Sequence, residues 1–105
     1  MMNNETYLDF CFIRKSTGNF VTEIDEMLTK LFKGVKVNWY LEEKSLEDAE
    51  MVVAEVKGMS HWRSEEETLN FLEEHGGSQF WEYLQGYKMF IYPVTMRGCN
   101  SCGTH

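Results

Sequence analysis

Hydrophobic and polar residues alternate along residues 35–43, which form the clearest strand in the sequence. Val35, Val37 and Trp39 occupy alternate positions, with Lys36 and Asn38 between them. β-Branched and aromatic residues at such spacing suit a pleated, half-buried surface. We therefore predict a central strand here, followed by an acidic loop.

A second strand is predicted over residues 7–14. Leu8, Phe10 and Phe12 fall on one face of this strand, and Tyr7 and Ile13 lie on the other. A strand that is apolar on both faces is typical of one covered on both sides. We therefore expect helices on both faces of the sheet.

Helical spacing appears between and after these strands. Apolar residues recur every three or four positions over residues 20–33, which predicts an amphipathic helix that ends at Gly34. Further helices are predicted from residue 64 to the double glycine at 76–77 and over residues 79–85, and a last strand over residues 88–92. A strand, helix and strand in succession form a right-handed crossover, so the two strands should run parallel.

The segment from residue 46 to 57 fits two periodicities. Ser45, with an acidic residue three positions later, is typical of a helix start and predicts a helix over residues 46–57. Val52, Ala54 and Val56 also alternate with their neighbours, which predicts a strand over residues 51–57. The helix gives a small α/β sandwich, with helices packed on a central mixed sheet. The strand gives a ferredoxin-like βαββαβ sandwich, which we keep as the alternative.

Length and composition indicate one globular domain. The chain has 105 residues, of which 43% are hydrophobic, and we expect a single α/β domain over residues 1–97 with a mobile tail over residues 98–105. The sequence shows neither a signal peptide nor an apolar run of membrane-spanning length. We therefore expect a cytoplasmic protein with no membrane partner, and leave its oligomeric state open.

The charge balance favours a protein partner. Seventeen acidic and ten basic residues give a net charge of −7. Direct nucleic-acid binding is disfavoured, because affinity for nucleic acid comes mostly from Lys and Arg that neutralise phosphates. A protein with a basic surface would be attracted instead, although the same charge also serves solubility. The acidic residues after the central strand are the expected partner-binding residues, namely Glu42, Glu43, Glu47 and Asp48.

These acidic residues also carry a resemblance to a known family. Val37-Asn38-Trp39-Tyr40 precedes them, and the strand before that ends in a Ser16-Thr17 turn that enters an amphipathic helix. Over roughly residues 8–50 this arrangement resembles the SiaC family of bacterial regulatory phosphoproteins, whose fold is close to that of STAS-domain anti-sigma-factor antagonists. The hairpin and helix that precede the first matched strand in that family have no counterpart here.

The resemblance implies control by phosphorylation. In the SiaC family a Ser/Thr turn at the helix entry is phosphorylated reversibly by a partner kinase and phosphatase, and Ser16 or Thr17 matches that position. A phosphate at a helix N-terminus meets free backbone N–H groups and the positive end of the helix dipole. The alternative is that Ser16 and Thr17 merely cap the helix.

The C-terminal residues invite a metal or thiol hypothesis. Cys99 and Cys102 have the Cys-x-x-Cys spacing of a zinc knuckle or a dithiol, and His105 could add a ligand. A zinc site needs four such ligands. A redox dithiol normally lies at a helix N-terminus that lowers the pKa of one thiol, and no helix can follow Cys102. We therefore predict no metal site and no cofactor. Cys99, Cys102 and His105 stay as the least favoured candidate ligands.

These observations favour a non-enzymatic protein-interaction or regulatory module. The sequence contains no nucleophile with a base and no paired carboxylates at the spacing of a catalytic motif. A first alternative is an acidic inhibitor, such as an immunity protein or a nucleic-acid mimic, that blocks a basic enzyme surface. A second alternative is a thiol or zinc site at the C-terminal Cys-x-x-Cys.

Overall fold

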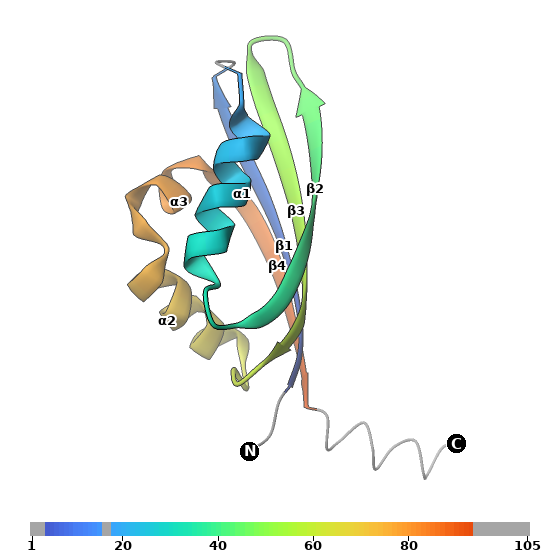
Figure 1. The fold of residues 1–105 in the computed structure, drawn as a ribbon, viewed down its shortest axis with the longest axis vertical. Helices are drawn as coiled ribbons and strands as arrows, with labels where there is room; N and C mark the ends of the chain where they lie inside the picture. Colours follow the sequence, from blue (N-terminus) through green and yellow to red (C-terminus); the bar gives the residue numbers. More distant parts are fainter. Residues whose placement is uncertain (1–3, 16–17, 94–105) are drawn as a thin grey trace, which may run out of the picture.

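The chain forms a four-stranded sheet with three helices packed on one face. The computed structural model describes residues 4–15 and 18–93. The elements in chain order are β1 (Asn4–Lys15), α1 (Phe20–Leu31), β2 (Lys36–Ser45), β3 (Ala49–Ser60), α2 (Glu65–His75), α3 (Gly77–Tyr83) and β4 (Leu84–Pro93). The helices lie together on one side of the sheet, and no described element covers its other side, which we call the bare face (Figure 1).

The strand order is β2-β3-β1-β4, and every neighbouring pair is antiparallel. This is the ferredoxin-like βαββαβ arrangement, with α3 following α2 before the last strand. The strands β1 and β2 run parallel to each other, as the crossover predicts, because both are antiparallel to β3. They are not neighbours, because β3 lies between them.

The predicted helix over residues 46–57 is wrong, and the strand alternative is confirmed. β3 occupies Ala49–Ser60 and pairs with β1 on one side and with β2 on the other. This second long strand converts the expected mixed sheet into an antiparallel one. It also moves β2 from the predicted central position to an edge of the sheet.

The expectation of helices on both faces is also wrong. Leu8, Phe10 and Phe12 of β1 are buried under the helices, but Tyr7 on the opposite face is 40% exposed. A hairpin connection replaces one of the helical crossovers that would have covered that face. The apolar residues on the second face are therefore a surface feature of the molecule.

Aromatic side chains fill the centre of the core. The ring centroids of Phe10, Phe12 and Phe80 lie 5.4 to 5.8 Å from one another, and all three side chains are buried. Burial of each such ring stabilises the fold by roughly 1.5–3 kcal/mol. α1 adds the buried residues at helical spacing that the sequence predicts, which are Phe20, Ile24, Leu28 and Leu31.

Gly58 allows β2 and β3 to approach each other closely. It pairs with Val37, and a Cβ at this position would overlap the backbone oxygen of Lys36 and lie 2.6 Å from the Cα of Val37. Only glycine fits here without displacing the neighbouring backbone.

We expect Gly58→Ala to lower the free energy of unfolding by about 2 kcal/mol or more, because β2 must move away from β3. Gly86→Ala is the matched control. Gly86 also lies in a strand, but a Cβ there meets nothing within 4 Å, so its effect should stay within about 0.5 kcal/mol. Urea unfolding of both variants measures the difference, and equal stabilities would contradict the packing argument.

Candidate functional site

The four acidic residues expected to bind a partner lie at one end of the molecule. Glu42 and Glu43 belong to the last part of β2, and Glu47 and Asp48 form the turn into β3. The backbone N–H of Leu46 donates to the carbonyl of Ala49 at 2.8 Å and helps to close this turn. All four acidic side chains are exposed. We call this set, Glu42, Glu43, Glu47 and Asp48, the acidic hairpin.

The acidic hairpin does not form a single flat patch. Glu42 pairs with Val53 and lies on the bare face, whereas Glu43 pairs with the buried Val52 and lies on the helix-covered face. Glu47 and Asp48 lie in the turn between β2 and β3, at the tip of the hairpin, and belong to neither face of the sheet. A partner that contacts Glu43 and the tip would therefore approach from the side of α1.

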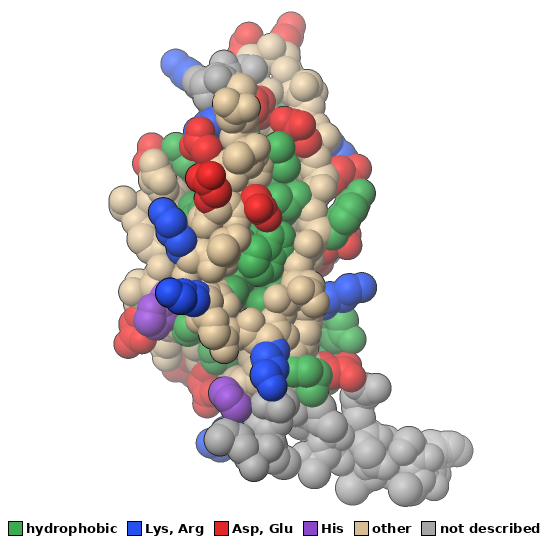
Figure 2. All heavy atoms as spheres, in the orientation of Figure 1, with side chains coloured by type: hydrophobic (Ala, Val, Ile, Leu, Met, Phe, Trp, Pro, Cys, Tyr) green, Lys and Arg blue, Asp and Glu red, His purple; other side chains and the backbone are tan. Residues whose placement is uncertain are grey.

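Acidic residues of α1 extend this surface. Figure 2 shows red side chains over the upper part of α1 and around the hairpin, with a green apolar strip between α1 and β2. Trp39 and Leu41, both partly buried, lie on the helix-facing side of β2. The indole Nε1 of Trp39 donates to Oδ1 of Asp25 at 2.9 Å and ties β2 to α1. Apolar groups with an acidic border thus lie beside the hairpin.

A charged network lies where β1 leads into α1. Arg14 donates to both carboxylate oxygens of Glu23, at 2.6 and 2.9 Å, and to the carbonyl of Gly18 at 2.9 Å. Its guanidinium lies 4.6 Å from the ring centroid of Phe20 and 5.7 Å from that of Tyr83, within cation–π range. The side chain of Arg14 is only 12% exposed, so the pair covers the end of the core.

This geometry explains two pKa shifts. The hydrogen bonds from Arg14 lower the pKa of Glu23, against a smaller opposing effect of burial and of the nearby Glu50 charge. The same hydrogen bond raises the pKa of Arg14. Glu50 is itself buried, and its Oε2 accepts a hydrogen bond from the backbone N–H of Gly18 at 2.6 Å. The end of β1, Gly18 with the first turn of α1, and the start of β3 therefore meet here.

Ser16 and Thr17, the phosphorylation candidates, lie outside the described residues. The N-cap of α1 is Asn19, and its side chain makes no capping hydrogen bond. Arg14, which the sequence places next to the candidate hydroxyls, is engaged with Glu23.

The tail candidates Cys99, Cys102 and His105 also lie outside the described residues. Within residues 4–15 and 18–93, no group of three or more His, Cys, Asp or Glu side chains is arranged to hold a metal ion. No helix in this same part of the chain is long and apolar enough to cross a membrane.

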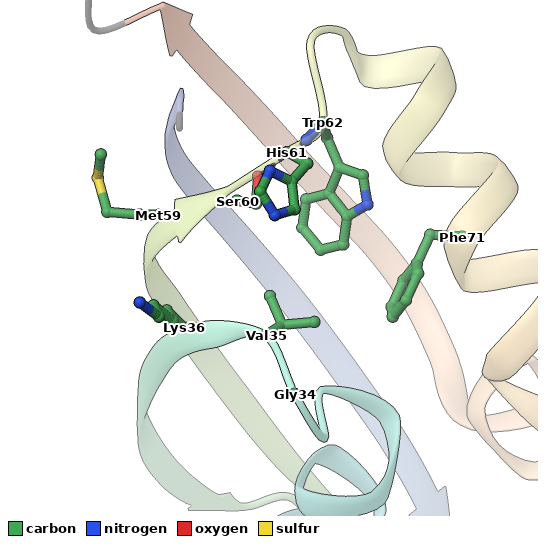
Figure 3. A pocket seen from close by; sticks show the side chains of 8 residues that line it. All are labelled: Gly34, Val35, Lys36, Met59, Ser60, His61, Trp62 and Phe71. Carbon is green, nitrogen blue, oxygen red and sulfur yellow. Dashed lines mark hydrogen bonds between the residues drawn. The ribbon is translucent and has the colours of Figure 1, made fainter. Parts of the chain in front are cut away.

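A hollow of about 440 Å³ lies at the opposite end of the sheet from the acidic hairpin (Figure 3). It is lined by Gly34, Val35, Lys36, Met59, Ser60, His61, Trp62 and Phe71. The rings of Trp62 and Phe71 form its apolar wall, with centroids 4.9 Å apart. Lys36 and His61 also belong to the lining, which contains no carboxylate, but the Lys36 side chain points away from Trp62 and Phe71 (Figure 3). The hollow offers mainly apolar contacts, without the paired acid and base of a hydrolytic site.

Sequence reasoning did not find this hollow or the charged network. The hollow joins the α1–β2 turn, the end of β3 and α2, which are far apart in sequence. Glu50 was assigned to the wrong predicted helix, so its contact with Gly18 could not be expected. The alternation of residues 51–57 was the signal that could have placed it correctly.

Comparison with known proteins adds support for the fold alone. No protein-family model and no curated protein matches the chain. A solved structure of the de novo designed protein Foldit4 is similar, with a TM-score of 0.53 and 9% identity over 83% of this chain and 94% of that chain.

Two natural domains are matched at lower similarity. The C-terminal domain of the MgtC protein from Mycobacterium tuberculosis has a TM-score of 0.46 and 4% identity, over 84% of this chain and 86% of that one. A putative antibiotic biosynthesis monooxygenase from Bacillus cereus has a TM-score of 0.33 and 23% identity, over 88% and 89%. Neither likeness carries an argument about function.

The Arg14–Glu23 pair predicts a specific pH dependence. A carboxyl whose pKa is lower in the folded state than in the unfolded state stabilises the fold above the unfolded value, here near 4.5, and this contribution is lost as the pH falls through the folded value. Glu23→Gln should therefore lose less stability than the wild type between pH 5 and strongly acidic pH, measured by thermal melting across that range. Glu26→Gln, a change at an exposed position of the same helix, should keep the wild-type slope. Parallel profiles for all three proteins would contradict the ion-pair assignment.

Proposed function

We propose that the chain is a non-enzymatic protein-interaction module that binds a basic protein surface through the acidic hairpin. The observation that carries the proposal is the position of these carboxylates, which are all exposed in the last part of β2 and in the turn into β3, at one end of the sheet. Complementary charge accelerates association and selects partners of opposite sign. We further propose that it acts in the cytoplasm, where a thiol such as the free Cys11 stays reduced.

The apolar strip beside the hairpin supports the same proposal. Trp39 and Leu41 are partly exposed between α1 and β2, next to Glu43. Interfaces commonly join a small apolar centre to a polar rim, and Trp is among the residues that contribute most to binding energy. A basic partner could therefore contact apolar and acidic groups at the same time.

Two described ionisable groups with a shifted pKa, Arg14 and Glu23, form a structural ion pair, which is consistent with a binding role for the chain. The main cause of each pKa shift is their hydrogen bond to each other. That ion pair packs on the end of the core rather than in the hollow. Its arrangement supports a structural role for the pair.

Charge reversal tests the acidic hairpin. The variant Glu43→Lys with Glu47→Lys should slow association with the partner at least tenfold and change dissociation less, because long-range attraction is lost. Glu73→Lys with Glu74→Lys is the matched control, since it makes the same charge change on exposed positions of α2. Partners are captured by the wild type at low ionic strength, identified by mass spectrometry, and measured by surface plasmon resonance over a range of salt concentrations.

Added salt should weaken wild-type binding, since screening shortens the reach of exposed charges. Binding that is indifferent to salt, or equal losses in the hairpin and α2 variants, would contradict the proposal. If the captured partner is an enzyme whose activity is blocked by the wild type and not by the hairpin variant, the module acts as an acidic inhibitor.

Regulation by phosphorylation at Ser16 or Thr17 is a separate prediction. A phosphate on this turn would compete with Glu23 for Arg14, and so alter the start of α1. Ser16→Ala with Thr17→Ala should remove any phosphorylated form from intact-mass spectra of protein isolated from cells, and Ser16→Asp should change partner affinity. Ser78→Ala, at an exposed serine of α3, is the control. Spectra without a phosphorylated wild-type form under every growth condition would refute this prediction.

A further inference from the structure

The bare face of the sheet carries an exposed aromatic cluster. Tyr7 of β1 lies opposite Phe90 of β4, with Tyr92 two residues further along β4 on the same face. These side chains are 40%, 47% and 45% exposed, respectively. The rings of Tyr7 and Tyr92 meet edge to face at 5.9 Å, and those of Phe90 and Tyr92 are stacked at 6.5 Å. We call these three residues the aromatic patch.

The patch lies on a surface that no described helix covers. All three helices pack on the opposite face of the sheet (Figure 1). Exposed aromatic rings that touch one another form a contiguous apolar surface, which in soluble proteins commonly marks an interaction site. The patch and neighbouring Glu5 line an open hollow of about 550 Å³, so the surface is not flat.

The charges around the patch are balanced, unlike those of the whole chain. Glu5 and Asp9 flank Tyr7 along β1, while Lys57 lies opposite Tyr7 on β3 and Lys88 lies opposite Asp9 on β4. Two carboxylates and two ammonium groups therefore surround the aromatic rings. The chain as a whole has a net charge of −7, so the balanced charge here would reduce the repulsion that another acidic molecule meets.

The same balance holds over the rest of the bare face. Strand alternation and pairing place four acidic and five basic side chains on it. The acidic ones are Glu5, Asp9, Glu42 and Glu55, and the basic ones are Lys15, Lys36, Lys44, Lys57 and Lys88. A surface with nearly equal numbers of both signs can be complementary to itself when two copies meet across a twofold axis.

The geometry points to a second copy of this chain as the occupant of the aromatic patch. The two bare faces would pack against each other so that the aromatic rings of the two copies meet, with the carboxylate and ammonium groups around these rings. This matches the apolar centre and polar rim of protein interfaces. The aromatic patch lies at the opposite end of the strands from Glu47 and Asp48, which form the turn of the acidic hairpin.

The area of the face is sufficient for a dimer. Four strands about 4.8 Å apart, with about ten residues each rising about 3.3 Å, outline a face on the order of 600 Å². Standard interfaces bury about 800 Å² of accessible surface on each partner, and side chains make the accessible area larger than the outline. Two-layer packing of sheets through their apolar faces is a common arrangement.

A matched pair of variants on β4 tests the dimer. Phe90→Lys places a charge in the patch, and the twofold symmetry introduces it twice. Tyr87→Lys is the control, because Tyr87 is 41% exposed on the same strand but pairs with the buried Phe10, on the helix-covered face. Sedimentation velocity over a range of concentrations should give a dimer for the wild type and for Tyr87→Lys. The dissociation constant of Phe90→Lys should rise at least tenfold.

A wild type that stays monomeric at several hundred micromolar would overturn the inference. Dimerisation weakened by Tyr87→Lys as much as by Phe90→Lys would also overturn it. If circular dichroism shows that Phe90→Lys is unfolded, the inference is tested on the wild type alone. In its NMR spectra, recorded at increasing concentration, the signals of Tyr7, Phe90 and Tyr92 should shift, whereas those of Glu47 and Asp48 should stay unchanged. Shifts confined to other surfaces, or binding of the monomer to lipid vesicles through the patch, would refute it.

Discussion

The antiparallel pairing of β3 with strands on both of its sides is the constraint on which the rest of the structure depends. Twelve residues of β3 pair with β1 and ten pair with β2. Because side chains alternate along a strand, this register sends Val52, Ala54 and Val56 into the core and Met51 and Val53 to the bare face. A slip of one residue would exchange the two sets and expose the core.

The same pairing explains why local sequence patterns misjudged this segment. Residues 46–57 fit both a helix and a strand. Ser45, followed by an acidic residue three positions later, is typical of a helix start. In the structure those residues form a hairpin turn, in which Leu46 is 43% exposed. Pairing with two neighbouring strands satisfies the backbone of β3, and no local periodicity reveals those partners. The strands 7–14 and 35–43 and the helix 20–33 were predictable, because each fits only one pattern.

The candidate site was predictable in part for a similar reason. The acidic hairpin is contiguous in sequence, so its residues had to lie near one another in any fold. The opposite directions of Glu42 and Glu43 follow from strand alternation once β2 is known to extend to Ser45. The aromatic patch and the hollow beside Trp62 join segments that only the tertiary fold brings together. Their residues carried no local pattern that distinguishes a surface aromatic ring from a core one.

Charge is unevenly divided between these surfaces, and this division relates the two proposals. The patch lies near the start of β1 and the end of β4, whereas the hairpin lies at the far end of the sheet, beyond β2 (Figure 1). A dimer formed through the balanced face would leave Glu43, Glu47 and Asp48 of both acidic hairpins free, because of the hairpin residues only Glu42 lies on that face. Two linked hairpins could then bind a basic partner with repeated or symmetric sites more tightly than one, because the second contact forms within the same complex. The strength of binding to such a partner should therefore depend on protein concentration in the range where the dimer forms, whereas a partner with a single basic site should show no such dependence.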